Sequence, residues 1–169
     1  MLFGALTVVR PGELRHAEWT EIDFDAKLWN IPAVKMKMDL PHIVPLSRQA
    51  LAILEGLKPL TGASRYIFTN GRSFAKPLSE NGVTAALAYM GFHGKHSGHG
   101  WRATFRTILD EVLRFRVEFI EHQLAHAVKD ANGRAYNRTA FLDDRRGMMQ
   151  TWADYLDGLK KRAKVLPFK

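Results

Sequence analysis

The sequence predicts a mainly α-helical (α+β) domain, a helical bundle with one small antiparallel sheet of about three strands at its edge. Apolar residues at helical spacing, which is typical of helices that bury one face, recur in four stretches: 51–57, 83–90, 101–112 and 148–159. Three shorter stretches have the length and flanking turns of strands: 19–24, 28–31 and 42–46. With 169 residues, 46% of them hydrophobic, the chain is expected to form a single domain over residues 1–169.

Local signals place the elements of the first third of the chain. Residues 2–9 are apolar almost throughout, which predicts the end of a buried helix. Pro11 suits the first turn of a second helix, and Arg10 lies at the junction between the two. Ser47 is a suitable N-cap for a further helix. We expect that helix to end at residues 56–59, because they include a glycine and a proline.

Helices are expected to dominate the rest of the chain. Residues 66–68 predict a buried extended segment, and residues 148–159 predict the buried face of a final helix. Three tyrosines lie in apolar surroundings and are expected in the core or in an interface: Tyr66, Tyr89 and Tyr155.

The stretch 97–138 gathers the residues that carry chemistry. A helix is expected to begin near His99, which places His99 and Arg102 together on one face of its first turn. A helix N-terminus beside a fixed guanidinium is a good seat for a phosphate. A second short helix ends near His126, and a turn at residues 132–133 then presents Tyr136, ten residues after that histidine.

This set of side chains favours phosphoryl transfer over acyl transfer or metal hydrolysis. A tyrosine hydroxyl has a pKa near ~10, so it needs nearby cations or a base to act as a nucleophile. The same cations would stabilise the transition state of a phosphodiester electrophile. The arginines and histidines around Tyr136 therefore predict a covalent phosphotyrosine intermediate.

Composition sets the remaining bounds. The formal net charge of +8 and a sequence pI of about 9.9 favour a polyanionic partner. The chain has no cysteine, which excludes disulfides and thiol chemistry and fits a reducing cytoplasm. No apolar run approaches the ~18 residues that a membrane span requires, so no membrane partner is expected.

These motifs together resemble the tyrosine recombinase (phage integrase) family. His99-x-x-Arg102, then Leu124-x-His126 and Tyr136, are similar to the C-terminal half of that family's catalytic domain. Residues 7–14 resemble its first arginine box, and residues 35–47 resemble its β-hairpin lysine with the strand that follows. The residues of these motifs are most similar to those of prophage integrases of bacterial genomic islands.

The resemblance implies a role for each motif residue. Tyr136 is the expected nucleophile and forms a 3′-phosphotyrosine link to DNA. Arg10 and Arg102 hold the phosphate, His99 and His126 hydrogen-bond to it, and no metal or other cofactor is implied. Lysine supplies the general acid, and Lys37 fits the motif better than Lys35. Five residues are expected to contact DNA: Lys35, Asn81, Thr84, Arg106 and Arg138.

The resemblance also implies partners. They are double-stranded DNA at attachment sites, a tetramer of the full-length enzyme, and an excisionase or a host DNA-bending factor, in the bacterial cytoplasm at the nucleoid. We expect the chain to lack the family's N-terminal DNA-binding domains and the first helix of the catalytic domain. We therefore expect a C-terminal fragment that binds DNA weakly and in a salt-sensitive way.

Three alternatives stay open at this stage. A decayed integrase would keep its basic surface and bind DNA without cleaving it. His93, His96 and His99 recur every third residue, which would suit a zinc-dependent hydrolase. The apolar N-terminal stretch would also suit self-association.

Overall fold

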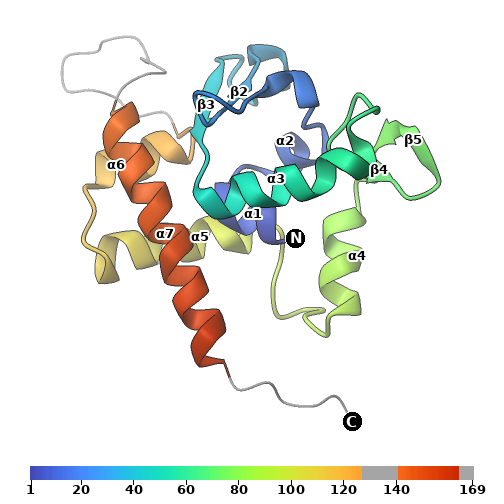
Figure 1. The fold of residues 1–169 in the computed structure, drawn as a ribbon. Coiled ribbons are helices and arrows are strands. Elements are labelled where there is room, and N and C mark those ends of the chain that lie inside the picture. The colour runs from blue at the N-terminus through green and yellow to red at the C-terminus, as the bar shows by residue number, and fades with distance from the viewer. Residues whose placement is uncertain (127–140, 164–169) are drawn as a thin grey trace.

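A computed structural model of the chain describes residues 1–126 and 141–163 (Figure 1). The α-helices in these ranges are α1 (Leu2–Thr7), α2 (Pro11–Arg15), α3 (Arg48–Thr61), α4 (Gly82–Tyr89), α5 (Gly100–Thr107), α6 (Val117–Gln123) and α7 (Leu142–Arg162). Two 3₁₀ turns (Trp19–Glu21 and Ala33–Lys35) and a π-helical segment (Ile108–Val112) accompany them. The strands are β1 (Ile22–Asp23), β2 (Leu28–Ile31), β3 (His42–Pro45), β4 (Thr69–Asn70) and β5 (Ser73–Pro77).

The expected three-stranded sheet is present and is antiparallel in the order β1-β2-β3. Trp29 pairs with Val44, and Ile31 pairs with His42. Trp29, Ile31 and Val44 are fully buried, because alternate residues of a strand face the same side of a sheet. The sheet therefore turns one face toward the helices and covers one edge of the bundle (Figure 1).

Helix α1 is the centre around which the other helices pack. It contacts α3, α5 and α7, and its residues Phe3 to Thr7 are all buried. The final helix α7 buries Met148, Met149 and Trp152, as expected from their spacing, and the Trp152 indole N–H donates to the Ala5 carbonyl at 2.8 Å. Each large side chain buried in this way contributes roughly 1.5–3 kcal/mol. Helix α1 thus joins α3, α5 and α7 in one core.

Helix α3 continues past the point where the sequence predicts its end. Pro59 lies inside the helix, which runs on to Thr61. Tertiary hydrogen bonds hold this last turn: the Thr61 hydroxyl donates to Ile67 O at 3.0 Å, and Trp19 Nε1 donates to Thr61 O at 2.9 Å. Trp19 lies 42 residues before Thr61, so local signals did not reveal its contact with the end of the helix.

Two further expectations about local structure need correction. Residues 19–21 form a 3₁₀ turn instead of a strand, because Glu21 reaches back to the Glu18 N–H at 3.2 Å. Beyond the expected extended segment at 66–68, the chain also forms an unpredicted hairpin, β4–β5. Its short strands carry no clear alternation of apolar and polar residues.

Tyr89 lies on the surface, contrary to expectation. It is 95% exposed at the end of α4, whereas Val83 and Leu87 on the same helix are buried. The helix projects from the body of the molecule (Figure 1), so its last turn extends beyond the core.

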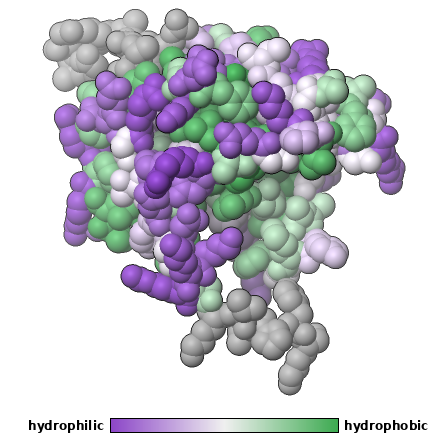
Figure 2. All heavy atoms as spheres, viewed as in Figure 1, coloured by the Kyte–Doolittle hydropathy of each residue, from purple (hydrophilic) through white to green (hydrophobic). Residues whose placement is uncertain are grey.

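An apolar groove of about 330 Å³ lies between α3, α4 and the N-terminal residues, and Phe3, Leu57 and Val83 are among its lining residues. It corresponds to the apolar area below α3 in Figure 2, whereas hydrophilic side chains gather over α7. Among the residues that the structure describes, no helix combines the length and apolar character needed to cross a membrane.

Candidate active site

Two left-handed turns present main-chain carbonyls to the two arginines of the predicted site. Val8 ends α1 with φ 52°, and Ala125 follows α6 with φ 48°. Arg102 donates from Nη1 to Val8 O at 2.7 Å and from Nη2 to Leu124 O at 2.5 Å. Arg10 donates from Nη2 to Ala125 O at 3.3 Å. The turn after α6 therefore holds both guanidinium groups, although they are far apart in sequence.

Arg10 is held from the side of α2 as well. It is the N-cap residue of that helix, and its Nη1 forms an ion pair with Glu13 Oε1 at 2.9 Å. Glu13 also accepts a hydrogen bond from the Arg10 backbone N–H at 2.8 Å. Glu13 thus supports the Arg10 guanidinium and caps its backbone N–H. The Arg10 side chain keeps 20% of its surface exposed, so it can still contact a ligand.

Arg102 is buried close to this second cation. Burial is the main cause that lowers the pKa of Arg102, to about 10, and the positive charge of Arg10 lowers it further, while Glu13 and Glu121 act in the opposite direction. The group remains protonated at neutral pH. Two guanidinium groups whose positive charges repel each other favour the binding of an anion.

His126 completes this arrangement. Its Nε2 lies 3.2 Å from Arg102 Nη2, and its Nδ1 lies 2.5 Å from Glu121 Oε2. The hydrogen-bond partners assign the tautomer: Nδ1–H donates to the carboxylate, and Nε2 accepts from the guanidinium. The ring therefore directs Nε2 toward the arginine cluster.

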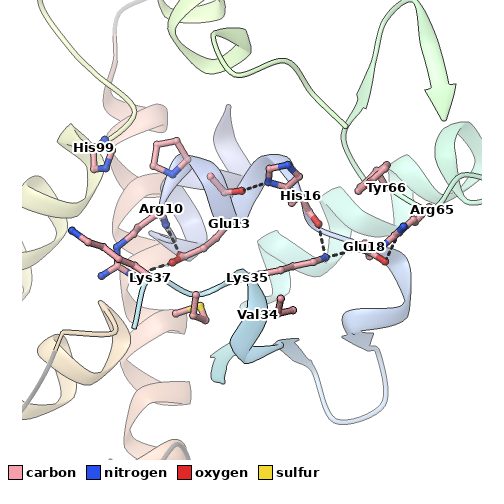
Figure 3. A pocket seen from close by; sticks show the side chains of 13 residues that line it. Arg10, Glu13, His16, Glu18, Val34, Lys35, Lys37, Arg65, Tyr66 and His99 are labelled. Carbon is pink, nitrogen blue, oxygen red and sulfur yellow. Dashed lines mark hydrogen bonds and ion pairs between the residues drawn. The ribbon is translucent and has the colours of Figure 1, made fainter. Parts of the chain in front are cut away.

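An open groove of about 740 Å³ begins at Arg10 and runs past α2 and the β2–β3 loop. Arg10, Lys37 and His99 lie at one end of it, and Arg65 and Tyr66 lie at the other (Figure 3). Tyr66 was expected in the core or an interface, and it is half-buried and lines this groove. Sequence reasoning missed Arg65 as a groove residue, although a basic residue beside an aromatic one is typical of nucleic-acid surfaces.

The two lysines of the β2–β3 loop occupy different environments. Lys35 Nζ donates to Glu18 Oε1 at 2.6 Å and to His16 O at 2.8 Å (Figure 3). It also forms an ion pair with Glu21. Lys37 is exposed and lines the groove, and it takes part in no ion pair within the described parts of the chain. Of these two lysines, Lys37 is therefore the one that offers its ammonium group to a ligand in the groove.

His99 lies at the same end of the groove as Arg10. It is the N-cap residue of α5, exposed, and three residues before Arg102. His96 instead packs against the Trp101 ring, with the ring centroids 4.1 Å apart. No group of three histidine, cysteine or acidic residues that could hold a metal ion occurs within residues 1–126 and 141–163.

The residues predicted to contact DNA lie in several places. Asn81 and Thr84 are exposed at the start of α4. Arg106 is also exposed, but its Nε donates to Glu121 Oε1 at 2.9 Å. Lys35 forms ion pairs with the carboxylates of Glu18 and Glu21. The predicted nucleophile Tyr136 and Arg138 both fall outside the described residues.

Comparison with known proteins identifies the family of this chain. Residues 1–142 match the model of the phage integrase family, and the chain belongs to that family. It is 45% identical over 161 residues to the prophage integrase IntA of Escherichia coli K12, covering 95% of this chain and 39% of IntA. It is 44% identical over 167 residues to the integrase of Enterobacteria phage P4, covering 90% of this chain and 38% of that protein. The chain thus spans about two fifths of the length of these relatives.

Solved structures confirm the fold class. The XerA recombinase superposes with a TM-score of 0.59 at 18% identity, over 83% of this chain and 55% of that one. A lambda integrase tetramer bound to a Holliday junction superposes with a TM-score of 0.55 at 18% identity, over 80% of this chain and 42% of that one. The mainly α fold with a small antiparallel sheet is therefore the one that tyrosine recombinases have.

Proposed function

We propose that this chain carries the catalytic centre of a site-specific DNA recombinase of the prophage-integrase type, which cleaves and rejoins strands through a 3′-phosphotyrosine intermediate. The observation that carries the proposal is the convergence of Arg10, Arg102 and His126 on the turn after α6. Arg10 also borders the groove that contains Lys37 and His99. Membership of the phage integrase family supports the same reaction.

The arginine cluster is the proposed seat of the scissile phosphate. Arg10 and Arg102 donate to the non-bridging oxygens, where negative charge increases in the transition state. Because carbonyl oxygens already hold both guanidinium groups, little reorganisation is needed when the phosphate arrives. Removing one preorganised donor of this kind typically costs about 10²–10³ in rate.

Covalent chemistry needs a nucleophile, a base and an acid. Tyr136 attacks phosphorus, and a new oxygen–phosphorus bond forms as the bond to the 5′ oxygen breaks. His99 accepts the proton of the tyrosine hydroxyl, and Lys37 donates a proton to the leaving 5′ oxygen. Attack by the 5′ hydroxyl of another strand on the phosphotyrosine reverses these steps and completes the exchange. The phosphodiester energy is retained in the phosphotyrosine bond, so the reaction consumes no ATP and uses no metal ion.

The proposed partner is duplex DNA at an attachment site. The net charge of +8 favours binding that rests on phosphate contacts and weakens with salt. The lambda integrase found as a tetramer on a Holliday junction supports a tetramer of the complete enzyme here. We place the reaction at the bacterial nucleoid, with an excisionase or a DNA-bending protein as an accessory factor.

The test uses a suicide substrate that carries the attachment site mapped from the ends of the integrated element. A nick beside the cleavage point lets the short product diffuse away, so the covalent adduct accumulates. We expect an adduct on denaturing gels that resists chelator and is lost with Tyr136→Phe. An adduct that persists in Tyr136→Phe, or that disappears with chelator, would overturn the mechanism. Salt-dependent binding without any adduct would identify the DNA-binding remnant instead.

A further inference from the structure

Glu121 holds the segment after α6 at several points. Its Oε2 accepts from His126 Nδ1 at 2.5 Å, and its main-chain carbonyl accepts from the His126 N–H at 3.0 Å. Its other carboxylate oxygen, Oε1, accepts from Arg106 Nε at 2.9 Å. One residue on α6 thus fixes both the backbone and the ring of His126.

These contacts form a continuous chain of side chains that ends in the arginine cluster. Arg106 binds Glu121, Glu121 binds His126, and His126 Nε2 faces Arg102 Nη2 at 3.2 Å. The His126 side chain is 43% exposed, so packing alone leaves its ring free to rotate. Without the carboxylate, Nδ1–H loses its acceptor, and the contact with Arg102 Nη2 is left to orient the ring by itself.

The carboxylate is charged under ordinary conditions. Burial acts to raise the pKa of Glu121, but hydrogen bonds from His126 and Arg106 outweigh it, and the pKa is lowered overall. Arg106, whose side chain is 48% exposed, holds the second oxygen and so restricts rotation of the carboxylate. A charged, doubly held carboxylate is well suited to orient an imidazole.

We propose that Glu121 is a positioning residue of the active site, which fixes the tautomer and orientation of His126 so that Nε2 accepts from the Arg102 guanidinium and holds it in the phosphate-binding cluster, with Arg106 as its support. This inference rests on the proposed function. It gives Arg106 a task within the protein beside any contact with DNA. Glu121 itself does not touch the phosphate; it acts through His126.

The first experiment examines the contact without any reaction. Long-range ¹H–¹⁵N spectra of the histidine side chains distinguish the two neutral tautomers and the protonated ring. We expect His126 in the Nδ1–H form in the wild-type chain and a mixture of tautomers in Glu121→Ala. The control is Glu118→Ala on the same helix, because Glu118 is exposed and, among the described residues, forms an ion pair only with Arg116, at 3.4 Å. An unchanged His126 spectrum in Glu121→Ala would overturn the proposal.

The second experiment measures single-turnover cleavage of the suicide substrate at saturating protein. Misplacing a catalytic group by about 1 Å can cost roughly 10²-fold in rate, so Glu121→Ala is expected to cleave about 10²-fold more slowly with the Kd for DNA unchanged. Glu121→Gln retains an acceptor for Nδ1–H and should recover part of the rate, while Glu118→Ala should cleave like the wild type. In a His126→Ala background, Glu121→Ala should add little further loss.

Failure of this proposal can be told apart from failure of the proposed function. A wild-type chain that forms no adduct counts against the recombinase mechanism itself. A wild-type chain that cleaves, together with Glu121→Ala cleaving equally fast, counts against Glu121 alone. Fully additive losses in the double variant would show that Glu121 does not act through His126. Thermal melting of each variant shows whether a slow rate reflects loss of the fold.

Discussion

Lys35 and Lys37 show how strongly a few ångströms of surroundings change the use of a side chain. Glu18 and Glu21 neutralise Lys35, and the same Glu18 binds Arg65 at 2.9 Å. The hydrogen bond from Arg65 is the main cause that lowers the pKa of Glu18; burial opposes it, and Lys35 lowers the pKa further. Lys35 therefore belongs to an internal ion-pair cluster, and Lys37 is left to act in the groove.

This difference predicts opposite behaviour of two substitutions. Lys37→Ala should slow cleavage by about 10²–10⁴-fold, because a general acid is lost. Replacing the bridging 5′ oxygen of the substrate by sulfur should restore its rate, because a thiolate leaves without being protonated. Lys35→Ala should instead destabilise the fold by about 1–3 kcal/mol, since it leaves carboxylates without a partner. Single-turnover cleavage of the normal and the sulfur-containing substrate tests the prediction for Lys37→Ala. Urea unfolding tests the prediction for Lys35→Ala. Sulfur rescue of Lys35→Ala and not of Lys37→Ala would reverse the assignment.

At the scale of an element, helix α3 depends on its first turn. Ser47 Oγ accepts from the Ala50 N–H at 3.3 Å, and Ser47 is only 4% exposed. The cap lies directly after β3, so it sets the angle at which the chain leaves the sheet and enters the helix. The N-cap predicted from the sequence is thus confirmed.

Ser47→Ala should lower the free energy of unfolding by about 1 kcal/mol, because an unsatisfied helix N–H is left without its acceptor. Urea unfolding monitored by circular dichroism measures the change. Ser79→Ala serves as the matched control, because Ser79 is exposed. An equal effect of both substitutions would show that the Ser47 hydroxyl does not cap α3. The folded Ser47→Ala chain should keep its cleavage rate.

At the scale of the whole molecule, buried histidines make stability depend on pH. Burial is the main cause that lowers the pKa of His42, to about 3, and Arg145 contributes, while the hydrogen bond with Gln123 O opposes it. Burial followed by Arg145 also lowers the pKa of His122. Both rings are neutral in the folded chain. The unfolded chain takes up protons near the ordinary value of 6.5, so acid favours unfolding.

The sign of the effect follows from this difference in proton uptake. Stability is fully present above pH 6.5 and is lost as the pH falls from there toward 3, by up to ~1.4 kcal/mol per pH unit for His42. We expect the free energy of unfolding to drop by about 2 kcal/mol between pH 7 and pH 5. His42→Gln, which cannot take up a proton, should show a smaller drop in the same urea titrations. Equal pH slopes in the two proteins would rule out His42 as the cause.

Local patterns in the sequence determined much of this protein. The spacing of apolar residues in 148–156, the N-cap at Ser47 and the strands around Trp29 and Val44 are signals within a few residues, and the structure confirms them. Hydrophobic period and capping act over one or two turns, so a single sequence contains them in full. The motif residues Arg10, His99, Arg102 and His126 were found instead through motif spacing and the family resemblance, and their roles remain predictions, as does that of Tyr136.

Only the tertiary structure decided how these residues meet. Nothing near Arg10 in the sequence indicates that its guanidinium binds the carbonyl of Ala125, or that Val8 and Ala125 adopt left-handed turns that aim their carbonyls at arginines. The end of α3 beyond Pro59 and the capture of Lys35 by Glu18 likewise depend on partners far along the chain. Hydrogen bonds and ion pairs between distant segments leave no periodic trace in the sequence, because they depend on the packing of the complete fold.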